Sequence, residues 1–147
     1  MDNINLQSKA RPLTGRIEHY WFENEHIGLK KTRFHRILIP FEPFDSGLTH
    51  VSQPESTSLV VEWLALEVED PSRLGGVKIS SASAPDMEAS IYLGAAHNWF
   101  QISDLSLSED GADFLVHCTG TVQFENEGVA RNERFTLNAR AQYVGEA

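Results

Sequence analysis

The C-terminal third of the chain alternates between apolar and polar positions. From Phe114 to Phe124 every second residue is apolar or small, and the residues between are mostly polar. A period of two over this length is typical of a half-buried strand and does not fit an amphipathic helix. The same alternation runs from Phe135 to Tyr143. Because the linking segment Glu125–Glu133 contains a glycine, the pattern predicts a long antiparallel hairpin.

A third strand precedes this hairpin. Trp99–Leu107 is mostly alternating, but its apolar positions change phase near Ser103–Asp104, which predicts a β-bulge. Asp110-Gly111 supplies a turn into the next strand. Residues 98–143 are therefore expected to form a three-stranded meander.

The first two thirds of the chain give a less regular pattern, with prolines and glycines between short apolar runs. Leu59–Glu69 is interpreted as a strand, and a helix is the alternative because Leu59, Trp63 and Leu66 also sit at helical spacing. The other predicted strands are Thr14–Phe22, Thr32–Ile39, Val77–Ser83 and Glu88–Leu93. Together these patterns predict a single all-β domain over residues 1–147. We expect an antiparallel β-sandwich or an open barrel of about seven or eight strands.

Charge narrows the classes of partner. The chain has 12 Lys and Arg against 21 Asp and Glu, a formal net charge of −9. Such a chain repels the phosphates of nucleic acids and anionic membrane surfaces, so we expect neither as a partner. No apolar run is long enough to span a bilayer and no secretory signal is visible, so the expected location is cytoplasmic.

Motif searches predict no cofactor and no metal. The glycine-rich phosphate cradles, the G-x-S-x-G elbow and the H-E-x-x-H zinc pattern are all absent. His19, Glu23 and His26 would line one face of a helix as zinc ligands do, but the surrounding residues predict a strand and a turn. Cys118 falls on the apolar face of its strand and is expected to be inert core, out of reach of its neighbour His117.

Two groups of residues are candidates for binding. Trp21 lies between Tyr20 and Phe22, and three consecutive rings on a strand cannot all enter one core, so at least one must point outward or into a second layer. Trp99 poses the same problem beside Phe100. The polar face of the last hairpin, rich in hydrogen-bonding groups, supplies the second group. The full candidate set is Trp21, Trp99, His117, Thr119, Thr121, Gln123, Asn138 and Arg140.

The leading hypothesis is a non-catalytic binding module, immunity- or adaptor-like, whose acidic surface recognises another protein with a basic surface. Two alternatives stay open: a carrier of a small polar ligand with a barrel-like cavity, and an enzyme with a scattered histidine and carboxylate site. A homodimer is also an open alternative.

Overall fold

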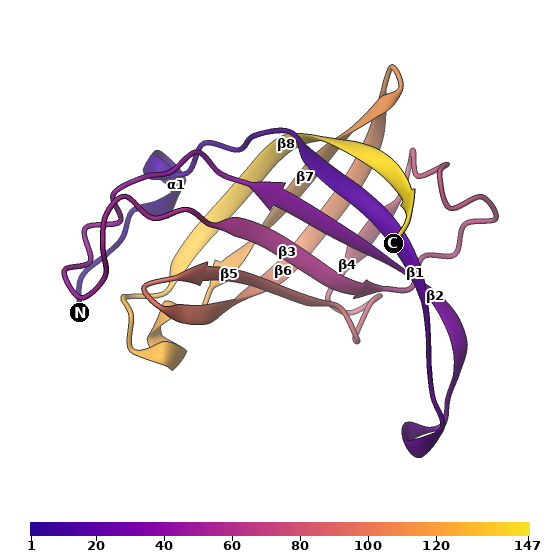
Figure 1. Ribbon diagram of the computed structural model, residues 1–147, viewed down its shortest axis with the longest axis horizontal. Coiled ribbons are helices and arrows are strands. Elements are labelled where there is room, and N and C mark those ends of the chain that lie inside the picture. The colour runs from indigo at the N-terminus through magenta and orange to yellow at the C-terminus, as the bar shows by residue number, and fades with distance from the viewer.

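The computed structural model describes residues 1–147 and is built almost entirely of strands (Figure 1). Two 3-10 turns, η1 (Glu25–Ile27) and η2 (Phe124–Glu127), and one short helix, α1 (Leu6–Lys9), are the other regular elements. The strands are β1 (Gly15–Asn24), β2 (Leu29–Pro40), β3 (Ser58–Leu64), β4 (Lys78–Ser80), β5 (Glu88–Leu93), β6 (Ala96–Asp110), β7 (Asp113–Val122) and β8 (Glu133–Glu146).

The eight strands form one sheet that closes on itself. Their order is β4-β6-β5-β3-β2-β1-β8-β7, and β6 also pairs with β7, so seven strands make a closed barrel. The short β4 pairs with β6 beyond the part of β6 that β5 covers. The predicted all-β fold and the C-terminal meander are confirmed. Neither the two separate sheets of a sandwich nor an open barrel edge is present.

One pairing departs from the antiparallel pattern. The first long strand and the last one, β1 and β8, run parallel, with Gly15 opposite Ala141. All other neighbours are antiparallel. This contact between the two ends of the chain joins the N-terminal strands to the C-terminal meander, and it makes closure of the barrel possible.

The alternation of the last hairpin is confirmed by burial. Phe114 is 5% exposed and Phe135 is 2% exposed, and the apolar residues that follow each of them at every second position face the same core. The intervening Asn138 is exposed and Thr119 is half-buried. β7 and β8 pair over nine positions, from Phe114–Ala141 to Val122–Glu133, which keeps the two apolar rows on one side of the sheet.

Packed segments cover both ends of the barrel. At one end, Ile4 and Leu6 from the N-terminal segment are almost fully buried in the core. At the other end, residues 65–77 bring Leu74, which is 0% exposed, into the same core (Figure 1). The barrel interior is therefore filled by side chains from its strands and from these two segments.

Two bulges interrupt the ladders. The predicted slip in β6 is confirmed, because the register with β7 shifts between Ile102 and Asp104. A second irregularity lies between β2 and β3, where Ile37 pairs with Val61 but His35 pairs with Leu64. Two residues of β3, Glu62 and Trp63, thus stand opposite one residue of β2.

Several predicted boundaries were wrong. The strand predicted over Leu59–Glu69 ends at Leu64, because Leu66 and Val68 pack on the core as part of the covering segment and form no ladder. The strand predicted from Thr32 begins at Leu29, because Glu25–Ile27 and Gly28 form a tight turn that leaves little loop. The strand predicted over Val77–Ser83 is only Lys78–Ser80, since the following residues turn back on Ser80.

A candidate binding groove on the outer wall

The three consecutive aromatic residues of β1 are divided between two faces of the β1–β2 hairpin. Tyr20 and Phe22 point to the outer wall of the barrel, and Trp21 points to the opposite face. Trp21 is 48% exposed and carries the ammonium group of Lys31 5.6 Å from its ring centroid. The expectation that at least one of these rings avoids the core is confirmed.

The bulge in β3 turns a large aromatic side chain outward. Val61 and Leu64 both face the interior and are almost fully buried, so Trp63 cannot follow the simple alternation. Its φ is 59°, a left-handed conformation that bulky residues rarely adopt. The indole consequently packs against the outward rings of Phe22 and Phe34, with centroid distances of 5.1 Å and 5.3 Å.

An arginine is held beside these rings. The Arg36 guanidinium donates from Nε to Glu62 at 2.6 Å and from Nη1 to Glu18 at 2.7 Å. Its Cζ lies 4.7 Å from the ring centroid of Tyr20. Burial, together with the hydrogen bond that the phenol donates to Glu62, raises the pKa of Tyr20 to about 12. This part of the wall is thus an internally satisfied network of an arginine, an aromatic ring and two carboxylates.

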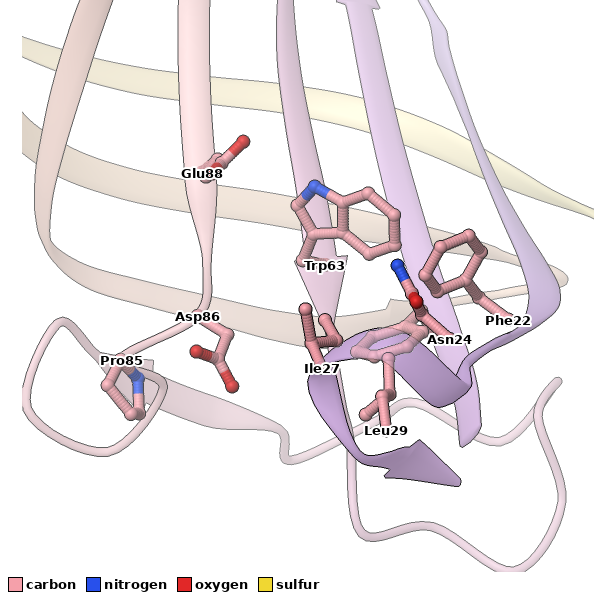
Figure 2. A pocket seen from close by; sticks show the side chains of 9 residues that line it. Phe22, Asn24, Ile27, Leu29, Trp63, Pro85, Asp86 and Glu88 are labelled. Carbon is pink, nitrogen blue, oxygen red and sulfur yellow. The ribbon is translucent and has the colours of Figure 1, made fainter. Parts of the chain in front are cut away.

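A groove of about 510 Å³ opens next to the network, between the tip of the β1–β2 hairpin and the segment that leads into β5. Figure 2 shows Phe22 and Trp63 on one side and Asp86 and Glu88 across from them. Both carboxylates are exposed, and neither forms an ion pair or a side-chain hydrogen bond within the chain. The lining residues are Phe22, Asn24, Ile27, Leu29, Phe34, Trp63, Pro85, Asp86 and Glu88.

The predicted polar face of the last hairpin lies together on the outside of β7 and β8, where its groups largely bond to one another. His117 is 2.7 Å from Asn138, and Thr119 is 3.0 Å from Thr136. Arg140 forms ion pairs with Asp110 and Asp113. The remaining candidates are similarly engaged: Thr121 accepts from Arg134, and Gln123 donates to Gln101.

Trp99 is placed apart from both surfaces. It lies on the outer face of β6 and is 45% exposed. A shallow depression there, about 330 Å³ in volume, is lined by Trp99, Gln101, Gln123 and Glu88 among others. Glu88 borders this depression and the groove as well, so the two hollows adjoin each other.

The histidine and cysteine side chains that the sequence analysis considered as metal ligands or catalytic groups do not form a common site. His19 lies at the inner side of the barrel and bonds to Tyr143, whereas His26 is exposed at the hairpin tip. No group of three or more His, Cys, Asp or Glu side chains is arranged to hold a metal ion. Cys118 is fully buried, and burial raises the pKa of its thiol to about 12, as expected of an inert core residue.

His35 links the hairpin to the segment that covers the barrel end. Its side chain is 0% exposed, and Nε2 donates to the carbonyl of Pro71 at 2.9 Å, while Nδ1 has no partner. Burial lowers the pKa of His35 below its usual 6.5, with smaller contributions from Arg33 and His19. Protonation would place an unpartnered charge in the core.

The free energy of unfolding should therefore fall as the medium is acidified. A histidine with a lowered native pKa gives stability that is complete above the unfolded value of 6.5 and is lost as the pH falls toward the native value. The contribution of His35 amounts to at most about 1.4 kcal/mol per pH unit in that window. Urea denaturation of the wild type and of H35Q between pH 7.5 and pH 5 measures it.

The matched control is H26Q, which removes an exposed histidine. The pH slope should become shallower in H35Q and stay unchanged in H26Q. Equal slopes in all three proteins would show that His35 does not resist protonation.

The groove residues were missed by the sequence analysis. Trp63 was noted only for its helical spacing, and Asp86 and Glu88 were not singled out. One feature of the sequence does mark the bulge: the buried positions run Leu59, Val61 and then Leu64, a phase change like the one in β6. Nothing in the local pattern brings residues 85–88 toward the hairpin tip.

Comparisons with protein-family models, with curated proteins and with solved structures give no match to this chain. Its helices are all too short to cross a membrane.

Proposed function

We propose that the protein is a non-catalytic binding module, and that its outer-wall groove docks a basic surface of another protein. The observation that carries the proposal is the combination of aromatic rings, of which Phe22 is exposed and Trp63 half-buried, with the unpaired carboxylates of Asp86 and Glu88 in one groove. Aromatic residues are enriched at the centres of protein interfaces, and complementary charge accelerates and orients docking.

The net charge of −9 supports a basic partner over a nucleic acid or an anionic membrane. The strained conformation of Trp63 also supports a functional role for the groove. A bulky residue in the left-handed region costs roughly 1–3 kcal/mol, and such costs gather at functional sites. Here the conformation turns an indole to the surface, where it lines the groove, instead of into the core.

The groove is a better docking site than the polar face of β7 and β8. On that face His117, Asn138 and Arg140 already have partners within the chain. A partner would have to break these contacts, whereas the groove carboxylates offer acceptors that no other side chain of the protein occupies.

The two alternative functions receive less support. The carrier hypothesis needs an interior cavity, but side chains fill the barrel and the 510 Å³ groove lies outside it. The enzyme hypothesis needs a histidine and a carboxylate in a cleft. His19 lies 4.0 Å from Glu146 but lines none of the described hollows. His117 does line a hollow of about 330 Å³ on the outside of β7 and β8, but no carboxylate is among the residues that line it.

Capture from an extract of the source cells tests the proposal. The wild type and D86N/E88Q are immobilised at equal density, and the retained proteins are identified by mass spectrometry. We expect the wild type to retain at least one basic protein. The amount of this protein retained by D86N/E88Q should be lower by about tenfold or more, because two groove charges are lost. Its association rate should also decrease with added salt.

The control is E42Q/E127Q, which removes the same amount of charge. Glu42 follows the end of β2 and Glu127 follows the end of β7; both are exposed, and neither lines the groove. This variant should retain the partner as the wild type does. An equal loss with both variants would mean that only total charge matters. Retention unaffected by D86N/E88Q, or an acidic partner, would contradict the proposal.

A further inference from the structure

The chemistry of the groove is that of a site for an organic cation. Aromatic faces attract cations through their quadrupole, and nearby carboxylates add a charge-assisted hydrogen bond. Phe22, Phe34 and Trp63 supply the rings, and Asp86 and Glu88 supply the carboxylates. The groove is open to solvent rather than enclosed, so a side chain of another protein can enter it between the residues that Figure 2 shows.

We propose that this groove receives an arginine side chain of the basic partner, with the guanidinium stacked on Trp63 and hydrogen-bonded to Asp86 and Glu88. The proposal rests on the proposed function and names the group that the partner inserts.

The neighbouring network provides an intramolecular example. Arg36 lies over the ring of Tyr20 and donates to Glu62 and Glu18, so one guanidinium already occupies a site made of an aromatic face and two carboxylates. Trp63 is in edge contact with Tyr20, with 5.8 Å between the ring centroids, and it is therefore shared between that network and the groove. The groove offers the same groups without a resident cation.

Arginine fits these groups better than lysine does. Its planar guanidinium can stack on an indole while its N–H groups fork toward two carboxylates, and it is more weakly hydrated than an ammonium group. Glu88 opens β5 and Asp86 lies in the turn two residues before it, so one short segment of the chain brings both carboxylates to the groove. Lysine would satisfy one carboxylate at a time as a compact point charge.

Titration by NMR with blocked tripeptides tests the proposal on the unmodified protein. The probes are acetyl-Gly-Arg-Gly-amide, the lysine analogue, and the citrulline analogue, which keeps the shape but is uncharged. The readout is the indole N–H signal of Trp63, assigned by W63F, together with the backbone amides of Asn24, Asp86 and Glu88. A single side chain should bind with a dissociation constant of about 1 mM.

With the arginine peptide we expect saturable shifts of these signals. The dissociation constant of the lysine peptide should be about threefold higher or more, and the citrulline peptide should give no saturation. D86N and E88Q should each weaken the arginine peptide about threefold or more, whereas E127Q should leave it unchanged. No saturable shift of the groove signals with the arginine peptide would overturn the proposal. Equal binding of citrulline, or of lysine, would overturn it as well.

The two proposals fail separately. If groove variants lose the partner in the capture experiment but the arginine peptide does not bind, the docking function stands and arginine is not the anchor. If the arginine peptide binds but the partner is retained by D86N/E88Q, the docking function is wrong and the groove is a cation site of another purpose.

Discussion

Replacing Gly120 with alanine is expected to lower the free energy of unfolding by about 3 kcal/mol or more. Gly120 faces the core on β7, opposite the bulge in β6. A Cβ at this position would overlap the carbonyl oxygen of Gln101 and lie 2.9 Å from the Cα of Ile102. Both are backbone atoms, so relief requires β6 and β7 to separate where the barrel closes.

Thermal or urea denaturation of G120A measures this effect, and G111A is the control. Gly111 lies in the β6–β7 turn with a φ of 62°, and a Cβ there would meet nothing within 4 Å. Its replacement costs only the left-handed conformation, roughly 1 kcal/mol. If G120A were no less stable than G111A, the close approach of β6 and β7 would not exist in solution.

The second large effect is expected for N98D. Asn98 is 0% exposed, and its Nδ2 donates to the carbonyls of Ile91, Leu93 and Ala96 at 3.0–3.1 Å. An ionised carboxylate of the same shape has no donor, so it would face three buried acceptors with an uncompensated charge. We expect a loss of about 3–5 kcal/mol at pH 7.5, measured by urea denaturation.

Acidification should recover part of this loss, because a protonated carboxyl regains one donor and carries no charge. N138D serves as the control, since Asn138 is exposed and its side-chain oxygen, which faces His117, is preserved in an aspartate. Its stability should stay within about 0.5 kcal/mol of the wild type. If N98D lost as little stability as N138D, the hydrogen bonds from the Asn98 amide to the three carbonyls would not stabilise the fold.

The strand predictions were most accurate where the alternation of apolar and polar residues was long and uninterrupted. The strands predicted over Phe114–Phe124 and Phe135–Tyr143 are confirmed as Asp113–Val122 and Glu133–Glu146, because one face of each is buried and the other faces solvent, although Phe124 belongs to the 3-10 turn that follows. The phase change at Ser103–Asp104 likewise revealed its bulge. The strand that begins at Leu59 was extended too far, because apolar residues that cover the barrel end resemble a continued strand.

Closure and the groove depend on contacts that local patterns do not encode. The parallel pairing of β1 with β8 joins residues more than 100 positions apart, so no turn sequence between the two strands predicts it. The groove is assembled from the hairpin tip, the β3 bulge and residues 85–88, three segments separated along the chain. The polar face of β7 and β8 was recognised as one surface, but its internal pairing became visible only in three dimensions.

Site-directed photocrosslinking in the source cells tests most directly whether the groove is the docking surface. A benzophenone side chain replaces Ile27, which is 71% exposed at the rim of the groove, or Leu115, which is 44% exposed on the outer face of β7. Irradiation should join a basic protein to the chain through position 27 and not through position 115. An adduct formed through position 115 but not through position 27 would contradict the account.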